Sequence, residues 1–493
     1  MNFDAREVAK HNSRRSCWIV ISGQVYDVTA FLDDHPGGPN VILRYGGKDA
    51  TEEYALIHPP GTIEKELPSD KHLGAIDPNT IEQDAGHIQA SEAMFGKSSS
   101  SIDLMPLPVC QNLDDIEYVA QQKLPKKTWV YYDSAADSLA SQTNNRADWM
   151  CVTFRPRIMR DVARVVMKRR YLGHENDLPF FIAPAAMAKL GHPDGELCLA
   201  RGAARSNITY CTSTYSSVSH DSIAECLRQE RKRGALAFQL YIPKAKRNGE
   251  KLIAMARKLG FKALVITVDT AVVGKREADE RAKAEVEWQE NGGIEVPRVP
   301  DPDPNAEAPI LRGAHSSSLV WEDLTWIREK WGPNSGPVYL KGIQSAEDAK
   351  LALDMGLDGI YLSNHGGRQL DFAPSSIRTL LEIKKFHPEI LTRMEVLVDG
   401  GVRRGTDVIK ALCLGATAVG LGRPFMYALS AYGTEGVMRA IQLLSEEIET
   451  TMRLLGITHL DQLNDKQVNA VALERELMRD ISNDALYSQP SKL

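Results

Sequence analysis

The sequence predicts an α/β protein in which a (β/α)8 (TIM) barrel follows a small α+β domain. Eight short, nearly continuously apolar runs recur between residues 180 and 422, and most are followed by a segment with helical spacing. Such runs are typical of parallel strands covered on both faces, and eight units over about 250 residues is the usual size of this barrel. A run of serines near residue 100 separates an N-terminal module from the barrel. A doubly wound parallel sheet is the alternative for the larger part.

The expected strands are short enough to be bounded by turn residues and polar positions. They cover Phe180–Pro184, Ile208–Ser213, Leu236–Ile242, Ala263–Asp269, Pro337–Gly342, Gly359–Asn364, Glu395–Gly400 and Ala418–Gly422. Helical spacing is clearest in Ala346–Met355 and Asp407–Leu414.

One interval breaks the alternation of strand and helix. About 60 residues separate Arg276 from the fifth strand, and they include the Pro- and acid-rich run Val296–Pro309. We therefore expect a long irregular insertion over about 280–320, which acts either as a lid over the site or as a disordered spacer.

The N-terminal module spans residues 1–76 and contains four of the twelve histidines. A polar stretch with four consecutive serines, Ser98–Ser101, follows it and predicts a linker over 77–110. The alternative is a long surface loop within one domain. The barrel domain then covers 111–480, and a short polar tail, 481–493, either wraps a neighbouring subunit or is disordered.

Composition and charge exclude several classes of protein. The 493 residues carry a net charge of −6, which gives a nucleic-acid partner no electrostatic support. No apolar run approaches the roughly 18 residues needed to span a membrane. Seven scattered cysteines without a C-x-x-C pair favour free thiols in a reducing compartment, rather than a disulfide framework or a zinc site.

The first residues, Met1–Glu7, have the features of neither a signal peptide nor a transit peptide. The expected location is therefore cytoplasmic. The alternative is a trimmed form in the mitochondrial intermembrane space.

The first chemical motif is His35 followed by Pro36-Gly37-Gly38, with a second histidine, His58, 23 residues later. Pro fixes φ and the glycines free the backbone, so this tight turn can present an imidazole to a flat macrocycle. Two imidazoles on opposite faces would fill both axial positions of a haem iron and favour one-electron transfer. Either histidine alone is more often structural.

The fourteen residues Val25–Gly38 closely resemble the cytochrome b5 family. The resemblance implies haem b (protohaem IX) ligated by His35 and His58. The residues after His58, Pro59-Pro60-Gly61, depart from the usual Ser/Thr-rich turn of that family.

The second motif lies where the expected barrel strands end. The sixth strand runs into Ser363–Asp371, where His365 and Arg368 place a base and a carboxylate anchor three residues apart on a Gly-rich loop. Gly-rich turns with arginines, Asp399–Gly405 and Gly420–Pro424, follow the last two strands, where barrels usually bind phosphate.

The fourth and fifth strands bring Asp269 and Lys341 to the same end of the barrel. An ordinary ion pair inside the barrel is the alternative for these two residues. Two tyrosines, Tyr131 and Tyr241, are candidates for contact with a substrate, and the alternative is that both are ordinary core residues.

The runs S-N-H-G-G-R-Q-L-D, V-D-G-G-V-R-R-G-T-D and L-G-R-P resemble the FMN-dependent α-hydroxy acid dehydrogenase and oxidase family. The resemblance implies an enzyme that uses FMN to oxidise a small L-2-hydroxy acid, L-lactate to pyruvate being the expected reaction. Electrons would then pass singly to the haem and on to cytochrome c. It also implies a homotetramer. The alternatives are an oxidase that uses oxygen, a dehydrogenase for a larger 2-hydroxy acid, and a catalytically silent barrel beside an electron-carrier domain.

The same resemblance implies roles for single residues. His365 would be the base, and Asp269 would stabilise its cationic form. Arg368 would bind the substrate carboxylate bidentately, with Arg276 as a second, more mobile arginine. Lys341 would lie beside the flavin and stabilise the negative charge that develops on reduction.

Tyr131 and Tyr241 would hydrogen-bond the substrate, while Tyr215 and Val273 would line the pocket for its side chain, where a tyrosine could change which acid fits. Ala185 stands where relatives usually have threonine. The remaining flavin contacts are implied for Ala183, Pro184, Ala185, Ala186, Ser213, Gln239, Thr267, Ser363, Asp399, Gly400, Gly401, Val402, Arg403, Gly422 and Arg423.

Overall fold

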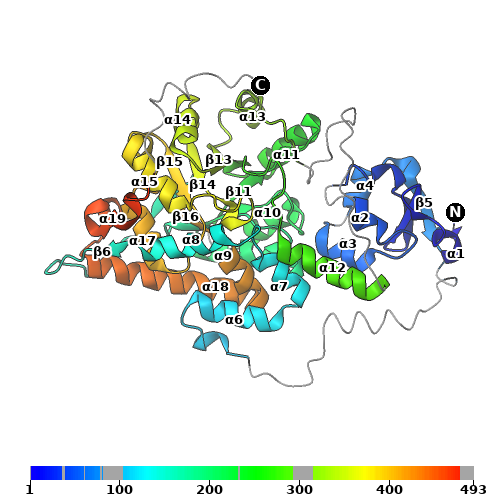
Figure 1. Cartoon of the computed structure of the whole chain (residues 1–493), viewed down its shortest axis with the longest axis horizontal. Helices are drawn as coiled ribbons and strands as arrows, with labels where there is room; N and C mark the ends of the chain where they lie inside the picture. Colours follow the sequence, from blue (N-terminus) through cyan, green and yellow to red (C-terminus); the bar gives the residue numbers. More distant parts are fainter. Residues whose placement is uncertain are drawn as a thin grey trace.

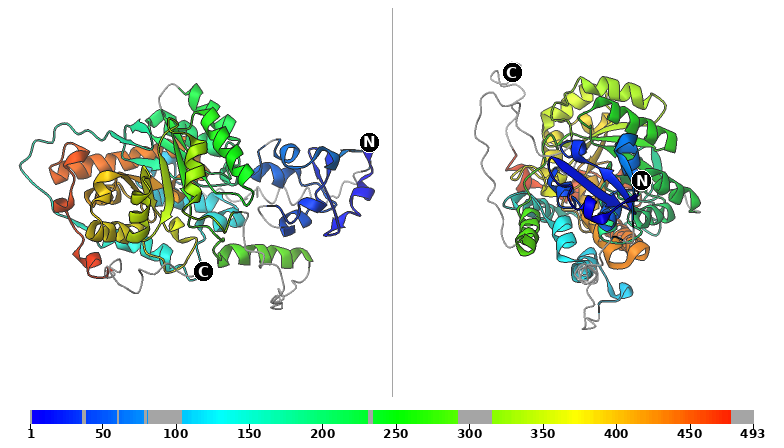
Figure 2. Two further views of the ribbon diagram at one scale, coloured as in Figure 1. Left: turned by 90° about the horizontal axis from the view of Figure 1, so that it is seen from above. Right: turned by 90° about the vertical axis from the view of Figure 1, so that its right-hand side faces the viewer.

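A computed structural model describes residues 2–35, 39–59, 61–77, 80, 104–230, 234–291 and 315–477. Most of the expected linker, the run 296–309, the Pro-Gly-Gly after His35 and the C-terminal tail lie outside the described residues. The N-terminal domain stands as a separate lobe beside the barrel (Figures 1 and 2).

The N-terminal domain is a mixed five-stranded sheet with short helices on it. The sheet order is β1-β5-β4-β3-β2. A two-residue turn, Ser22-Gly23, joins β3 to β4, and both residues have positive φ, as a tight hairpin that follows the strand twist requires. The strands are β1 Asn2–Phe3, β2 Asn12–Ser13, β3 Ser16–Ile21, β4 Gln24–Asp27 and β5 His72–Ile76, and the α-helices are α1 Ala5–Val8, α2 Pro39–Leu43, α3 Thr51–Ile57 and α4 Thr62–Glu66.

Eight parallel strands of the larger domain close into a barrel in the order β9 to β16, with β16 paired to β9. All eight expected strands are confirmed, and the doubly wound alternative is wrong. The strands are β9 Phe180–Ile182, β10 Thr209–Thr212, β11 Ala235–Leu240, β12 Ala263–Thr267, β13 Val338–Ile343, β14 Gly359–Leu362, β15 Glu395–Val398 and β16 Ala418–Leu421.

The strands are apolar on both faces because each face is buried against a different layer. One set of side chains fills the barrel interior, including Phe181, Tyr339 and Tyr361, each with no exposed surface. The alternate set packs under the surrounding helices. A hairpin of β7 Arg169–Tyr171 and β8 His174–Asn176 contacts β9 and β13 through hydrogen bonds from the Tyr171 hydroxyl to Phe180 O and from Leu172 N to the Tyr339 hydroxyl.

The helices around the barrel include the two that the sequence spacing predicts, α14 (Ala346–Asp354) and α17 (Gly405–Cys413). Figure 1 shows α18, kinked at Tyr432 and Gly433, running below the barrel beside α6. The helices are α6 Leu113–Lys123, α7 Lys126–Asp133, α8 Ala140–Met150, α9 Glu196–Ser206, α10 His220–Gln229, α11 Lys246–Leu259, α12 Glu277–Asn291, α13 Asp323–Trp331, α14 Ala346–Asp354, α15 Ser376–Phe386, α16 Ile390–Arg393, α17 Gly405–Cys413, α18 Arg423–Leu455 and α19 Val471–Glu474. A two-stranded ribbon pairs β6 Thr153–Phe154 with β17 Val468–Asn469.

The expectation of an irregular insertion is wrong for its first part. Residues Glu277–Asn291 form helix α12, which packs against α7, and Lys126 Nζ lies 2.9 Å from Glu285 Oε2. The segment is rich in Ala, Glu, Lys and Arg, which are strong helix formers, and it contains a Lys283–Asp279 ion pair between residues four apart. The acidic, Pro-rich run that suggested irregular chain begins only after this helix.

The described helices include none with both the length and the hydropathy needed to cross a membrane. All seven cysteines are unpaired.

Candidate active site

His365 lies on the loop after β14, in a backbone conformation that few residues other than glycine adopt. Its φ is +59°, and Gly366 and Gly367 after it also have positive φ. A side chain on Gly367 would come within 2.6 Å of Gln142 N, so glycine is required there. Ser363 Oγ accepts a hydrogen bond of 3.0 Å from His365 N and so supports the turn. Strained backbone of this kind is often found where a side chain must be aimed at a ligand.

The two ring nitrogens of His365 face different groups. Nδ1 lies 2.9 and 3.1 Å from the two carboxylate oxygens of Asp269, and Nε2 lies 3.2 Å from the Tyr241 hydroxyl. Because Asp269 fixes Nδ1–H, the lone pair of a neutral ring is on Nε2, on the side where a substrate can bind. The structure therefore brings together the base, its carboxylate and one of the two tyrosines.

The electrostatics suit a base that is neutral at rest. Burial lowers the pKa of His365, and the negative charge of Asp269 opposes that shift. Burial by itself would raise the pKa of Asp269, but its interactions with His365 and Lys341 and the hydrogen bond from the Thr270 hydroxyl hold that pKa well below its ordinary value. Asp269 is thus a permanent anion, ready to stabilise the imidazolium that forms when His365 takes a proton.

Lys341 is the centre of a second buried network. Its Nζ is 3.0 Å from Ser363 Oγ and 3.9 Å from Asp269 Oδ2, and Ser363 Oγ donates to Asp399 Oδ1 at 2.6 Å. On the neighbouring strands Gln239 Nε2 donates to Thr267 Oγ1 at 2.9 Å. These polar groups from five consecutive strands line one buried floor, where a flat polar ring system would find donors and acceptors.

Arg368 is held by backbone carbonyls rather than by an acid. Its Nη1 donates to the carbonyls of Tyr131, Tyr132 and Ser134 at 2.7 to 3.2 Å, and its guanidinium lies 5.5 Å from the centre of the Tyr131 ring. Arg423 donates to the same Tyr132 and Ser134 carbonyls, at 3.1 Å each. Both arginines and Tyr131 therefore meet at the C-terminal end of α7.

Positive charge accumulates at this end of the barrel. Burial and the charges of Arg276 and Arg423 lower the pKa of Arg368 to about 9. Arg276 Nε is buried without a hydrogen-bond partner among the described residues. Buried cations that repel one another indicate a site built for anions, as a flavin phosphate and a substrate carboxylate would be.

The turns expected to hold phosphate have the open backbone that close approach requires. Gly400 and Gly401 have positive φ, and a side chain on Gly401 would overlap the Asn145 carbonyl. A Cβ on Gly422 at the start of α18 would meet no atom within 4 Å. Arg403 forms an ion pair of 2.5 Å with Glu117, and Val402 is buried.

The remaining expected flavin contacts lie at the same end of the barrel. Ala183 N donates to Leu421 O at 3.0 Å, so the segment that continues through Pro184, Ala185 and Ala186 starts beside the end of β16. Ser213 directly follows β10 and is buried. The residues present therefore fit FMN.

In the N-terminal domain the two expected haem ligands face each other. The ring centroids of His35 and His58 are 6.0 Å apart, a gap that suits one metal ion with a metal–imidazole bond of about 2 Å on each side. Burial and His35 lower the pKa of His58 to about 4, which keeps its ring neutral and able to ligate. Tyr54 lies against His58, with ring centroids 4.7 Å apart. These residues fit a haem held by two histidines.

Some side chains that shape the site were not predicted from the sequence. His315 stacks on Tyr241 with ring centroids 4.2 Å apart, and Thr270 Oγ1 donates to Asp269 Oδ1 at 2.8 Å. Asn145 and Asn364 exchange two amide hydrogen bonds of 2.8 Å beneath the His365 loop. Thr270 could have been predicted, because a hydroxyl residue directly after Asp269 can hydrogen-bond the carboxylate. No local signal indicates His315 or Asn145, since both contacts join distant segments.

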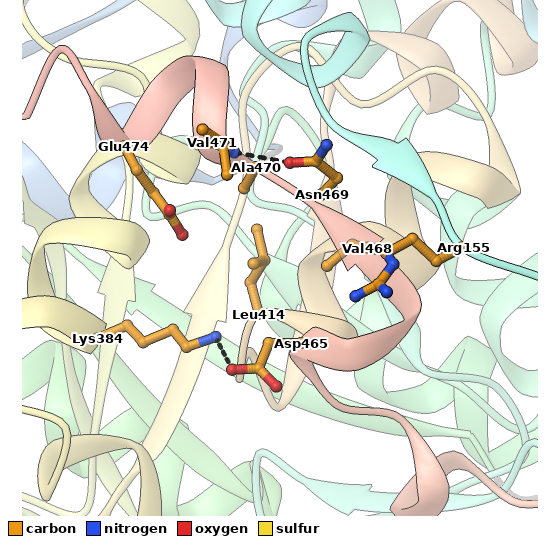
Figure 3. A pocket seen from close by; sticks show the side chains of 9 residues that line it. All are labelled: Arg155, Lys384, Leu414, Asp465, Val468, Asn469, Ala470, Val471 and Glu474. Carbon is orange, nitrogen blue, oxygen red and sulfur yellow. Dashed lines mark hydrogen bonds and ion pairs between the residues drawn. The ribbon is translucent and has the colours of Figure 1, made fainter.

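An open pocket of about 370 Å³ on another part of the surface does not belong to this site (Figure 3). It lies by the C-terminal ends of α15 and α17. Each of these helices runs antiparallel to the strand before it, so its C-terminal end is at the end of the barrel opposite the catalytic loops. Lys384 in its wall is paired with Asp465 at 2.8 Å, and Asn469 Oδ1 accepts from Val471 N. None of the residues that line it is among the predicted site residues, which lie at the opposite end of the barrel strands.

The chain matches two protein families. Residues 120–470 match the model of the FMN-dependent dehydrogenases, and residues 4–77 match that of the cytochrome b5-like haem/steroid-binding domain. An L-lactate dehydrogenase (cytochrome) of Wickerhamomyces anomalus is 40% identical, and one of Saccharomyces cerevisiae is 37% identical, each over 98% of this chain and 82% of the relative. The structure is similar to the recombinant flavin-binding domain of baker's yeast flavocytochrome b2, with a TM-score of 0.68 and 37% identity over 78% of this chain and 92% of that one.

Proposed function

Because the chain belongs to the FMN-dependent dehydrogenase family and carries a cytochrome b5-like domain, we propose that it oxidises L-lactate to pyruvate and passes the electrons to cytochrome c. Two similar proteins that extend over nearly the whole chain are named L-lactate dehydrogenase (cytochrome), which supports both the substrate and the acceptor. The observation that carries the proposal is the placement of His365 between Asp269 and the Tyr241 hydroxyl, in a site rich in buried cations.

FMN would lie over the buried floor formed by Gln239, Thr267, Lys341 and Ser363, with its phosphate at the turns that follow β15 and β16. His35 and His58 would ligate the haem. When bound, FMN accepts the two electrons of the substrate, and the haem carries them on one at a time. Lys341, buried and charged, favours negative charge on the adjacent edge of the ring system.

One group of residues would bind the substrate carboxylate, and another would face the substrate hydroxyl. Arg368 binds the substrate carboxylate with its free guanidinium edge, since its Nη1 is already held by three carbonyls. Tyr131 lies against that guanidinium and donates its hydroxyl to the same carboxylate. Arg276 adds a second positive charge. The substrate hydroxyl then faces His365 Nε2 and the Tyr241 hydroxyl.

Oxidation removes the hydrogen on C2, the hydroxyl proton and two electrons from the substrate. His365 Nε2 takes the C2 proton, or the hydroxyl proton if the transfer is hydride-like, and the electrons would go to FMN. The imidazolium is stabilised by Asp269 at 2.9 Å, which is already ionised. Tyr241 keeps its hydroxyl proton, because burial raises its pKa far above the neutral range, and it therefore serves as a hydrogen-bond donor.

The test is anaerobic mixing of the purified, cofactor-loaded protein with L-lactate while the flavin and haem bands are followed separately. We expect the flavin band to bleach first, the haem band to be reduced after it, and added cytochrome c to be reduced at the steady-state rate. A flavin band that L-lactate leaves unchanged contradicts the proposal. Consumption of oxygen at the full turnover rate, with cytochrome c left oxidised, would favour the oxidase alternative.

We also propose the domain division 1–76, 77–110, 111–480 and 481–493, a homotetrameric assembly, and a reducing compartment such as the cytoplasm. The unpaired cysteines support the compartment, and the assembly is the one that the family resemblance implies. Light scattering of the purified protein measures the assembly directly.

A further inference from the structure

Tyr215, which the sequence places at the pocket for the substrate side chain, and His315, which the sequence did not indicate, lie beside the reaction centre but neither moves the proton nor binds the carboxylate. The Tyr215 hydroxyl and His315 Nδ1 are 3.1 Å apart, so the two rings are linked by a hydrogen bond. The His315 ring stacks on Tyr241, with centroids 4.2 Å apart and an angle of 18° between the planes. The ring of Tyr215 also stacks on that of Tyr241, with ring centroids 5.6 Å apart. Since the Tyr241 hydroxyl contacts His365 Nε2, the Tyr215–His315 pair is one ring away from the atom that takes the substrate proton.

The pair lies on the side of the barrel away from the carboxylate anchor. Tyr215 follows β10 and Arg368 follows β14, and these strands are four apart in a closed barrel of eight, which places them opposite each other. His315 is fixed to the loop after β11, because Ser316 N donates to Ile242 O at 2.8 Å. A substrate held by its carboxylate at Arg368 and by its hydroxyl at His365 therefore extends the remaining substituent of C2 toward this pair.

Both members of the pair are neutral near pH 7. Burial, reinforced by repulsion from His365 whenever that ring is protonated, lowers the pKa of His315 to about 4, and burial raises the pKa of Tyr215 well above its ordinary value. Each ring thus brings one proton, and their single hydrogen bond uses one of the two. That bond uses the hydroxyl of Tyr215 and Nδ1 of His315, so His315 Nε2 is the ring atom left to face a ligand. The pair keeps hydrogen-bonding capacity but has no charge.

We propose that Tyr215 and His315 form a neutral polar end wall for the substrate side chain, and that they make the enzyme prefer a short 2-hydroxy acid with a hydroxyl on C3 over one with an alkyl group of the same size. This inference rests on the proposed function. A half-buried donor that faces an alkyl group loses its water without replacement, whereas a hydroxyl satisfies it. A neutral wall offers no counter-charge to a second carboxylate, so dicarboxylic hydroxy acids are not favoured.

The test compares L-glycerate with L-2-hydroxybutyrate, which differ by a hydroxyl in place of a methyl group. Flavin reduction in the holoenzyme is followed by anaerobic stopped flow, and the ratio of the second-order rate constants is taken. We expect L-glycerate to be favoured about tenfold or more. His315→Leu should bring the ratio to one or below, and His315→Gln, which keeps a donor, should preserve most of the preference. Tyr215→Phe should lower the ratio, while Tyr118→Phe on the exposed face of α6 is the matched control and should not.

L-Lactate is the reference substrate in every experiment. If L-lactate does not reduce the wild-type flavin, the proposed function itself fails. If L-lactate reduces it but the wild-type ratio is near one, or favours 2-hydroxybutyrate, the polar end wall is overturned. The same conclusion follows if His315→Leu retains the wild-type ratio. The wild-type comparison needs no variant, so the test holds even if a substitution impairs folding.

Discussion

Replacing Asp269 with asparagine tests the central electrostatic claim, because it removes one charge and little volume. The imidazolium formed on His365 has its Nδ1 2.9 Å from Asp269 Oδ1, which puts the centres of charge about 4 Å apart. At an effective dielectric constant near 20, that attraction is about 4 kcal/mol. The asparagine oxygen can still accept a hydrogen bond worth about 1 kcal/mol. The remaining loss of about 3 kcal/mol corresponds to a rate about a hundredfold lower.

The assay is single-turnover flavin reduction by L-lactate in Asp269→Asn, with the pH profile of the rate recorded beside it. Asp269 raises the pKa of His365 against burial, so its removal lowers that pKa further. The acid limb of the profile should therefore move to lower pH, although the rate at neutral pH falls. Asp354→Asn, which removes an exposed carboxylate paired with Lys350 on α14, is the control and should change neither quantity. A loss of less than tenfold, or an acid limb that moves to higher pH, refutes the reasoning.

Four further outcomes follow from the same geometry. In the wild type, kcat/KM should rise with pH and reach half its maximum below pH 6.5, because burial lowers the pKa of the base His365; a midpoint above 6.5 contradicts this sign. Lys341→Met should slow flavin reduction by about a hundredfold, the typical cost of removing a donor that stabilises developing charge; an unchanged rate would exclude that role. Arg368→Lys should lower kcat/KM by about a hundredfold, because lysine can neither bridge the α7 carbonyls nor bind a carboxylate bidentately. If titration with a substrate analogue shows that the variant binds it as tightly as the wild type does, Arg368 is not the carboxylate anchor. His58→Ala should abolish the haem Soret band and cytochrome c reduction while L-lactate still bleaches the flavin, and a retained haem band would show that His58 is not a ligand.

The barrel could be predicted from the sequence because its strands are buried on both faces. Runs such as Ala263–Thr267 contain hardly any polar residue, and no other secondary structure explains eight of them at this spacing. The Gly-rich turns after the strands could also be recognised, because the positive φ at positions such as Gly401 requires glycine. These features are local, and local patterns are what one sequence reveals.

The parts that could not be predicted depend on contacts between distant segments. His315 lies just after the Pro- and acid-rich run, and its partner Tyr215 is 100 residues away, so neither the hydrogen bond nor the stacking on Tyr241 has a local signature. Helix α12 is a different case. Its composition and its charge spacing are helical, but the acidic, Pro-rich run after it led to an expectation of irregular chain for both.

The C-terminal end of α7 explains how the fold can hold several buried cations together in a site for anions. Arg368 follows β14 and Arg423 follows β16, two strands further around the barrel, yet both donate to the carbonyls of Tyr132 and Ser134, where the helix dipole is negative. Carbonyls hold an arginine without neutralising it, whereas a carboxylate would cancel the charge that the ligands require. The arrangement also couples the two ligands, because a shift of α7 moves Tyr131 and both arginines at once. Helix α7 packs against α12, so the first part of the insertion lies against the helix that holds the substrate anchor.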